Sequence, residues 1–353
     1  MRILITGGLG YVGSHTVMEV LEAGHQPHVV DNLSNSSASV LSNMARLTDR
    51  KFGFTQADIR DAAAMAALVA DVAPEAVIHF AGLKAVGQSV SDPLDYFDNN
   101  VAGTITLLRA LQQSACRCFI FSSSATVYGE PAYLPIDESH PLRTTNPYGR
   151  TKLQIEGILE DLARSDPLWS IALLRYFNPV GAHPSGLIGE DPSGVPDNLL
   201  PYIAQVAVGR RPGLAVYGDD YDTVDGTGVR DYVHVRDLAR AHLDALHWAA
   251  GSGGRGCEPF NLGTGRGTSV LEMIHAFSEA SGRDIPYVIA PRRPGDVTAC
   301  YAAAGKAARV FGWRAERDLR DMCLSAWHWQ RSNPEGYPRG AETAPPREDL
   351  SRS

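Results

Sequence analysis

Short apolar runs alternate with longer amphipathic segments along the first half of the chain. The apolar runs predict six β-strands, over residues 2–6, 28–31, 52–58, 76–80, 118–123 and 170–177. The segments between them predict helices near residues 11–23, 37–48, 61–72, 93–115 and 147–165. Nearly continuous apolar strands separated by helices are typical of a parallel sheet covered on both faces. We therefore predict an α/β fold with a doubly wound parallel sheet (Rossmann), in which ligands bind beyond the carboxyl ends of the strands.

The pattern becomes less regular after Phe177. Residues 178–198 are rich in glycine and proline, which favours an ordered loop or lid. Beyond them we expect helices near residues 198–209 and 268–281 and strands near residues 214–217 and 287–290. We assign residues 1–178 to the Rossmann domain, onto which segments near 230–262 could pack back, and residues 179–340 to a smaller mixed α/β domain. Residues 341–353 lack apolar periodicity and are predicted to form a disordered tail.

Composition and charge exclude several classes of protein. The 353 residues are 44% hydrophobic and 20% charged, as in ordinary globular proteins. A net charge of -8 argues against binding to nucleic acid or to an anionic membrane. No apolar run approaches the roughly 20 residues of a membrane span, and the first residues do not resemble a signal peptide. The five cysteines and eleven histidines show no metal-ligand spacing, so we predict no metal and a reduced, cytoplasmic setting.

A glycine-rich turn follows the first strand and precedes a predicted helix. Gly8, Gly10 and Gly13 satisfy the G-x-G-x-x-G pattern, and Gly7 replaces Gly8 in a G-x-x-G-x-x-G variant. Such a turn lets the backbone approach a pyrophosphate, whose charge then lies at a helix N-terminus. Asp31 ends the second strand, where a carboxylate would bind the adenine ribose and repel a 2′-phosphate. The sequence therefore predicts a site for NAD rather than NADP.

A tyrosine and a lysine lie four residues apart at the start of a predicted helix. Asn146 is expected to cap this helix and Pro147 to begin it, so that Tyr148 and Lys152 share one face. Taken alone, the two residues could form a satisfied surface pair. The fifth predicted strand, however, ends in serines and is followed by Ser124, at the edge where the nicotinamide should lie. This coincidence favours a catalytic role.

The chemistry of a phenol explains why a lysine should be nearby. Tyrosine has an unperturbed pKa of about 10, so lowering that pKa by three units requires roughly 4 kcal/mol of preference for the phenolate. The ammonium of Lys152 and a positive nicotinamide ring could supply this preference. Ser124 would then position a substrate hydroxyl, and Tyr148 would remove its proton as hydride leaves the same carbon.

Several longer motifs support this interpretation and extend it over nearly the whole chain. They include "TGGLGYVGSH", "DNLSNSS", "AGLKAVGQSV", "FSSSATVYG", "PYGRTK", "RYFNPVGAHPSG" and "GTGVRDYVHV". On these motifs the chain, from Met1 to about Pro338, resembles the extended short-chain dehydrogenase/reductase family, and within it the isomerases that invert C4 of UDP-hexoses. The resemblance implies that UDP-glucose and UDP-galactose are interconverted through a 4-keto sugar with tightly bound NAD. It also implies a homodimer joined through helices near residues 93–115 and 147–165.

The resemblance assigns roles to individual positions. It makes Tyr148 the base and acid, Lys152 the ribose holder, and Ser124 the partner of the sugar hydroxyl. The positions expected to contact the cofactor are Gly7, Gly10, Tyr11, Val12, Gly13, Asp31, Asn32, Asn35, Ser36, Asp58, Ile59, Phe80, Ala81, Gly82, Lys84, Asn99, Ser122, Tyr148, Lys152 and Tyr176. The positions expected to contact the UDP-sugar are Lys84, Ser124, Tyr148, Asn178, Asn198, Leu199, Ala215, Val216, Tyr217, Arg230, Arg293, Asp296 and Cys300. Arginine suits the diphosphate because its planar fork can grip two oxygens, although an isolated arginine is often only solvated.

Cys300 is expected to set the width of the sugar pocket. Family members carry either a bulky tyrosine or a small residue here, and the small residue leaves room for an N-acetyl group at C2. The resemblance therefore implies that UDP-GlcNAc and UDP-GalNAc are interconverted as well. The alternative is that Tyr301 packs against Cys300 and no space is gained.

Three other functions compete with this interpretation. A nucleotide-sugar 4,6-dehydratase needs an Asp-Glu pair after the strand-five serine, where this chain has Ala125 and Thr126. A UDP-pentose 4-epimerase differs only in a substrate that lacks the C6 hydroxymethyl group. A non-catalytic NAD sensor could retain the glycine turn, but it would not need Tyr148 and Lys152.

Overall fold

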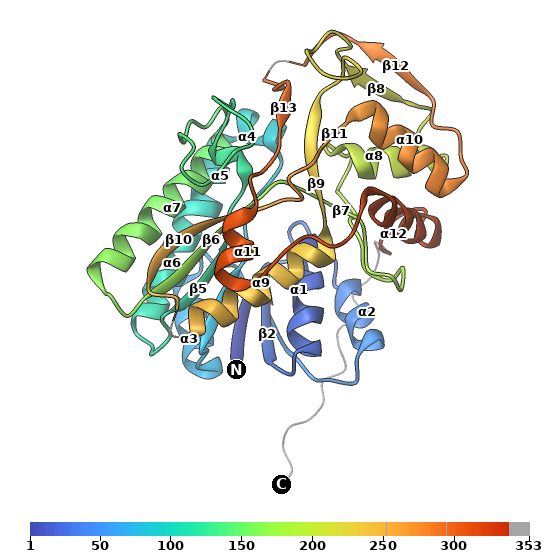
Figure 1. Cartoon of the computed structure of the whole chain (residues 1–353). Helices are drawn as coiled ribbons and strands as arrows, with labels where there is room; N and C mark the ends of the chain where they lie inside the picture. The colour runs from blue at the N-terminus through green and yellow to red at the C-terminus, as the bar shows by residue number, and fades with distance from the viewer. Residues whose placement is uncertain (252, 294, 339–353) are drawn as a thin grey trace.

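The computed structural model describes residues 1–251, 253–293 and 295–338. A seven-stranded parallel sheet lies at its centre, in the order β10-β6-β5-β4-β1-β2-β3 (Figure 1). The strands are β1 (Arg2–Thr6), β2 (Gln26–Asp31), β3 (Gly53–Gln56), β4 (Ala76–His79), β5 (Cys118–Ser122), β6 (Ser170–Tyr176) and β10 (Gly256–Leu262). All six predicted strands are present and the predicted fold class is confirmed. The strand order reverses between β1 and β4, where ligands bind in folds of this kind.

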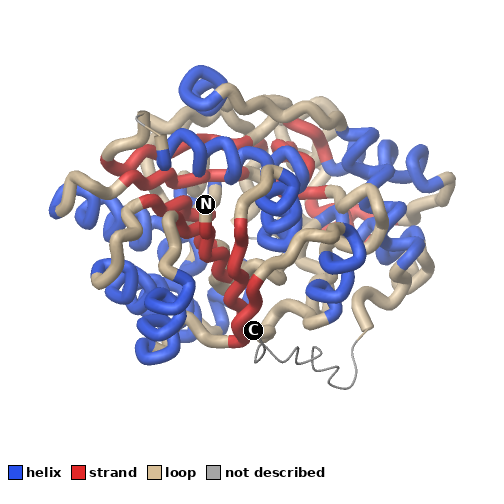
Figure 2. Tube along the Cα trace, turned by 90° about the horizontal axis from the view of Figure 1, so that it is seen from below, coloured by secondary structure: helices blue, strands red, loops and turns tan. Residues whose placement is uncertain are grey.

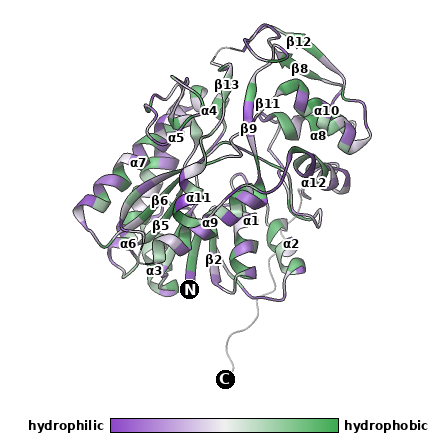
Figure 3. Ribbon diagram, viewed as in Figure 1, coloured by the Kyte–Doolittle hydropathy of each residue, from purple (hydrophilic) through white to green (hydrophobic). Residues whose placement is uncertain are grey.

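Helices cover both faces of the sheet (Figure 2). Apolar residues of α1 (Tyr11–Glu22), α2 (Ser39–Leu47) and α9 (Val235–Ala250) join one core cluster with Ile3 and Ile5. Residues of α3 (Ala62–Val72), α6 (Gly103–Gln112) and α7 (Pro147–Ser165) join a second cluster with Leu4. Alternate residues of β1 thus point to opposite faces, and both faces are apolar because both are buried. Figure 3 shows the resulting hydrophobic character of β5 and β6.

A smaller region packs beyond the carboxyl edge of the sheet. There β9 (Val229–His234) pairs with β7 (Asn178–Val180), β11 (Gly267–Ser269) and β13 (Ala299–Cys300), while β8 (Leu214–Tyr217) pairs with β12 (Tyr287–Ala290). Helices α8 (Leu199–Ala207), α10 (Val270–Ser281) and α12 (Leu319–Ser332) share its core. Helix α11 (Gly305–Phe311) lies beside β10 and α9. The domain boundaries at residues 178 and 340 stay predictions, and the predicted tail over 341–353 lies outside the described residues.

The prediction of one continuous helix near residues 93–115 is wrong, because this segment is divided into several helical pieces. The structure has α4 (Val86–Ser91), which the sequence did not predict, then α5 (Pro93–Tyr96), a π-helical turn (Phe97–Ala102) and α6. The π-turn carries Asn100, whose buried amide donates to Leu83 O at 3.0 Å and to Thr151 Oγ1 at 3.1 Å. These bonds tie the turn to α7 and to the loop after β4. Widened turns of this kind are frequent at functional sites.

The sequence also missed β9 and β10, for physical reasons. Asp231 in the middle of β9 is fully buried, and its carboxylate accepts hydrogen bonds from the backbone of Thr264, Gly265 and Ala302. Asp231 makes this strand look polar in the sequence, but hydrogen bonds from distant segments of the chain satisfy its carboxylate. β10 contains Pro259, which cannot complete a ladder, but β10 lies at the edge of the sheet, where proline is tolerated.

No helix among residues 1–251, 253–293 and 295–338 is long and apolar enough to cross a bilayer. Cys116 and Cys118 are buried around the start of β5, where they pack as small apolar residues.

His79, buried in β4, should make stability depend on pH. Its ring bonds to Thr6 Oγ1 at 2.6 Å and Thr104 Oγ1 at 2.8 Å, and burial lowers its pKa to about 3. Below pH 6.5 the His79 ring binds a proton in the unfolded chain but stays neutral in the folded chain. The free energy of unfolding that His79 contributes above pH 6.5 is therefore lost as the pH falls. Urea unfolding at pH 7 and pH 5 should show about 2 kcal/mol less loss in His79→Gln than in the unmodified protein. Equal losses in both proteins would contradict this assignment.

Candidate active site

The glycine turn between β1 and α1 is packed too closely for any side chain. Gly7 has φ +65°, and a Cβ added there would lie 2.7 Å from Ala81 N. A Cβ on Gly13 would lie 2.4 Å from Gly7 O. One on Gly8 would instead meet Val29, away from the cleft, so the set that shapes the cleft is Gly7, Gly10 and Gly13. Gly10 caps α1 without a side-chain bond, which leaves the helix N-terminus available to an anion.

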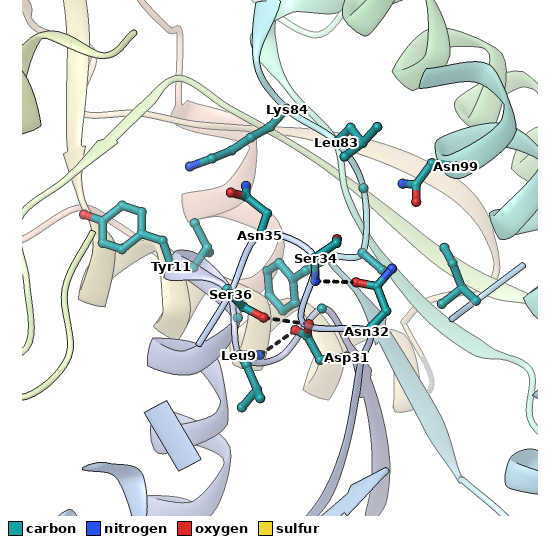
Figure 4. A pocket seen from close by; sticks show the side chains of 18 of the residues that line it. Leu9, Tyr11, Asp31, Asn32, Ser34, Asn35, Ser36, Leu83, Lys84 and Asn99 are labelled. Carbon is teal, nitrogen blue, oxygen red and sulfur yellow. Dashed lines mark hydrogen bonds between the residues drawn. The ribbon is translucent and has the colours of Figure 1, made fainter. Parts of the chain in front are cut away.

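A cleft extends from this turn along the carboxyl edge of the sheet (Figure 4). Asp31 lies at its floor, where its carboxylate accepts from Leu9 N at 3.1 Å, Leu33 N at 2.9 Å and Ser36 Oγ at 2.8 Å. The predicted cofactor residues that line the cleft are Gly7, Gly10, Tyr11, Val12, Gly13, Asp31, Asn32, Asn35, Ser36, Ile59, Phe80, Ala81, Gly82, Lys84, Asn99, Tyr148, Lys152 and Tyr176. The cradle without side chains and the fixed carboxylate fit a dinucleotide with free ribose hydroxyls.

Two predicted cofactor residues do not line the cleft. Asp58 is held by Arg60 and Asn32, and the hydrogen bond from Arg60 keeps the pKa of its carboxyl far below the usual range. Its neighbours Ala57 and Ile59 line the cleft instead. Ser122 is buried behind the wall, where its Oγ bonds to Tyr176 Oη at 3.0 Å and its carbonyl accepts from Lys152. Both residues support the cleft from outside.

Sequence reasoning missed part of the cleft wall. The additional lining residues are Leu9, Val30, Ser34, Ala57, Leu83, Gly189, Glu190, Asp191 and Pro192. Most of these neighbour predicted positions in the sequence. Gly189–Pro192 belong instead to the glycine- and proline-rich segment after β7, which returns across the cleft. The composition of that segment predicted an ordered loop but not its contact with the cleft.

Tyr148 and Lys152 lie together in the cleft wall on the first turns of α7. Asn146 caps the helix by accepting from Gly149 N at 2.8 Å, and α7 spans the predicted residues. The Lys152 ammonium lies 5.9 Å from the centre of the Tyr148 ring and donates to Ser122 O at 2.7 Å. Both side chains are at least nine-tenths buried. The prediction that they share one helical face agrees with this geometry.

Burial alters the pKa of both groups. It lowers the pKa of Lys152 to about 8, although the carboxylate of Glu156 opposes the shift. It raises the pKa of Tyr148 well above 10, and nearby Tyr176 adds to the rise, while a hydrogen bond with Ser124 opposes it. The groups of the chain therefore favour a protonated phenol on balance. The lowering expected for a base must come from positive charge that a ligand brings beside it.

A second pocket lies in the smaller region. The predicted substrate residues that line it are Asn178, Asn198, Leu199, Ala215, Val216, Tyr217, Arg230, Arg293 and Asp296. Arg230 is held by the carbonyls of Val229 at 2.9 Å and Val297 at 2.8 Å, and Arg293 pairs with Asp296 at 3.0 Å. Two guanidinium groups at one pocket are suited to a diphosphate.

Ser124 and Cys300 line neither pocket. Ser124 is buried just past β5, where its Oγ accepts from Thr126 N at 3.2 Å. Cys300 pairs in register with Arg230 and packs against a cluster that includes Tyr128 and Phe177. Burial raises the pKa of its thiol to about 11, which favours a small apolar role over a nucleophilic one.

The fold and the site are those of an extended short-chain dehydrogenase/reductase. The chain combines a dinucleotide cleft, a buried Tyr-Lys pair and a second pocket with two arginines. The family described as GDP-mannose 4,6 dehydratase matches residues 4–325. The chain is 55% identical over 337 residues to the UDP-glucose 4-epimerase of Bacillus subtilis, covering 96% of this chain and 99% of that one. The chain belongs to the UDP-glucose 4-epimerase family.

Solved structures agree with this assignment. The UDP-glucose 4-epimerase of Stenotrophomonas maltophila with bound NAD and formylated UDP-arabinopyranose is 51% identical at a TM-score of 0.92, covering 94% of this chain and 98% of that one. The enzyme of Bifidobacterium longum in complex with NAD+ and UDP is also 51% identical, at a TM-score of 0.91, covering 96% and 100%.

The close packing of the glycine turn gives a direct test. Gly13→Ala should place a methyl against Gly7 O, and overpacking of this kind costs about 1–3 kcal/mol. Retention of the dinucleotide should then fall roughly tenfold to a hundredfold. The cofactor content of the purified protein measures the effect. Gly157→Ala on α7 is the matched control, because its methyl would meet open space and should leave cofactor content unchanged. Full cofactor content in Gly13→Ala would contradict the proposed cradle.

Proposed function

We propose that the chain interconverts UDP-glucose and UDP-galactose by inverting C4 of the sugar, with NAD tightly bound. The observation that carries this proposal is the buried Tyr148–Lys152 pair in the wall of a dinucleotide cleft. The second pocket, with Arg230 and Arg293, supplies the place for a nucleotide diphosphate. Related enzymes with NAD and UDP in the same fold support both assignments.

The described residues suit NAD along the whole cleft. The turn at Gly7–Gly13 would hold the pyrophosphate, and Asp31 would accept from the adenine ribose. Lys152, Asn99 and Tyr176 would surround the nicotinamide end. When bound, NAD would supply the hydride acceptor for C4 and, once reduced, the hydride donor to its opposite face.

The proton at the C4 hydroxyl is handled by Tyr148. Its phenolic oxygen removes the proton as the carbon is oxidised and returns it when the carbon is reduced. Ser124, whose hydroxyl lies close enough to Tyr148 to lower the pKa of its phenol, would orient the sugar hydroxyl. Lys152 holds a positive charge beside the phenol and favours the phenolate once the site is filled. Burial excludes water that could take up the proton.

The substrate must be held at one end and free at the other. Arg230 and Arg293 would grip the diphosphate, the wall Ala215–Tyr217 would receive uracil, and Asp296 would bind the uridine ribose. Asn178 and Asn198 would contact phosphate or sugar oxygens. With the UDP held in this way, the 4-keto sugar can turn about its diphosphate link and present its other face.

Replacing Tyr148 by phenylalanine separates an enzyme from an NAD sensor. Tyr148→Phe should lower turnover of UDP-galactose at least about a hundredfold, because the proton acceptor is removed. Bound NAD should be unchanged, since the ring remains. A product assay on purified protein with no added cofactor measures turnover, and Tyr287→Phe at an exposed position serves as control. Undiminished turnover in Tyr148→Phe would sink the proposed mechanism.

The chain disfavours one related activity and leaves room for another. The family match carries the name of a 4,6-dehydratase, but Ala125 and Thr126 occupy the positions where such an enzyme needs carboxylates, so dehydration is disfavoured. A UDP-pentose is a second candidate substrate, because the similar enzyme of Stenotrophomonas maltophila was crystallised with a formylated UDP-arabinopyranose. Adding UDP-arabinose to the product assay tests this activity.

Cys300 is proposed to widen the sugar site for N-acetylated substrates. Its small, half-buried side chain lies next to Arg230 in register, near the second pocket. Cys300→Tyr should lower activity on UDP-GalNAc at least about tenfold relative to UDP-galactose, because a phenol would fill space needed by the acetyl group. Cys300→Ala should keep the original ratio. If the activity ratio between UDP-GalNAc and UDP-galactose is unchanged in Cys300→Tyr, Cys300 does not set the width of the sugar site. That result would favour the alternative that Tyr301 packs against Cys300.

We also propose a homodimer joined through α5, α6 and α7, the helices near residues 93–115 and 147–165, and a cytoplasmic setting. Leu94 of α5 is 80% exposed, and burial against a second copy would cover this apolar side chain. The five cysteines are all free, as expected of a reducing compartment.

A further inference from the structure

A short segment of the cleft wall is braced from behind by the C-terminal helix. The indole of Trp329 in α12 donates to Glu190 O at 3.1 Å, and Gly189 N donates to Tyr337 Oη at 3.1 Å. A Cβ on Gly189 would lie 2.3 Å from the Trp329 ring. The backbone of Glu190 is therefore held in one place, and its side chain projects from a rigid support.

The carboxylate of Glu190 lies where the two pockets meet. Its Oε1 accepts from Lys84 Nζ at 3.2 Å and from Asn198 Nδ2 at 3.2 Å. Lys84 lines the dinucleotide cleft, whereas Asn198 lines the second pocket. One oxygen thus joins a donor from each ligand site. The Glu190 side chain is only 10% exposed, which strengthens its hold on both donors.

Neither donor has another anchor of this kind. Among the described residues, Glu190 accepts the only hydrogen bond that either the Lys84 or the Asn198 side chain makes. The Lys84 side chain is half exposed, and its ammonium lies 5.8 Å from the centre of the Tyr11 ring. Without Glu190, both donors would be free to adopt several rotamers.

We propose that Glu190 is a positioning residue that holds Lys84 and Asn198 in place for the two ligands and thereby couples the dinucleotide cleft to the UDP-sugar pocket. This inference rests on the proposed function, because it takes the second pocket to bind UDP. Lys84 has three N–H donors and Asn198 has two, so each can keep its bond to Glu190 while it contacts a ligand.

The sign of the effect separates positioning from simple electrostatics. A carboxylate that acted only through its charge would repel the diphosphate, and removing that charge would tighten UDP binding. A carboxylate that orients two donors would do the opposite, because its loss leaves them disordered and a bound ligand must order them again.

The test is calorimetric titration of the NAD-loaded protein with UDP. Glu190→Ala should bind UDP about tenfold more weakly and Glu190→Gln about threefold more weakly, because the amide oxygen still accepts a hydrogen bond. Asp219→Asn is the matched control, because Asp219 is exposed, lines neither pocket and makes no hydrogen bond to Lys84 or Asn198 among the described residues. It should bind UDP as tightly as the unmodified protein.

A double variant provides a readout that general damage to the fold would not produce. If Glu190 acts through Asn198, the loss of UDP affinity caused by Glu190→Ala should be smaller in the Asn198→Ala background than in the otherwise unmodified protein. Additive losses would overturn the coupling, as would UDP binding by Glu190→Ala that equals or exceeds that of the unmodified protein. Thermal unfolding and NAD content check that each variant is folded. If Glu190→Ala does not fold, the same comparison is made with Glu190→Gln. Failure of the unmodified protein to bind UDP would instead refute the proposed function.

Discussion

The burial of an ionisable pair, Tyr148 and Lys152, is the constraint on which the rest of the site depends. Burial raises the pKa of the phenol and lowers that of the ammonium, so neither group is set for proton transfer by the chain alone. Positive charge from a bound ligand would reverse the balance at the phenol. Chemistry is then confined to the filled site, which suits a reaction whose oxidised intermediate must not escape.

A second buried pair supports the first. Glu156 lies one turn after Lys152 on α7, and its carboxylate accepts from Arg175 of β6 at 2.6 Å and from Ser123 at 2.5 Å. These bonds fasten the helix to the strands beneath the reacting residues. Removing one partner would leave a buried charge unpaired, which costs about 3–5 kcal/mol. The rigidity of α7 thus depends on polar groups that are satisfied inside the protein.

The two pockets meet at side chains from distant parts of the chain. Lys84 follows β4, Glu190 lies in the segment after β7, and Asn198 precedes α8. The first strands of the sheet place the dinucleotide, and the smaller region adds the arginines for a diphosphate. A sugar attached to that diphosphate can therefore reach the cofactor while remaining free to turn.

The sequence alone determined what local interactions control. Alternation of apolar runs predicted six strands and the fold class, and the capping pattern at Asn146 and Pro147 predicted where α7 begins. The Gly7–Gly13 turn and Asp31 predicted the dinucleotide site, because both lie within one βαβ unit. Only the tertiary structure decided which distant segments complete the site. Asp231 within β9 and Glu190 in the cleft wall look like ordinary polar residues in the sequence. Asp231 bonds to residues more than 30 positions away, and Glu190 bonds to Lys84, which is more than 100 positions away. Contacts between residues so far apart in the sequence depend on how the whole chain packs. The local spacing of apolar and polar residues does not predict them.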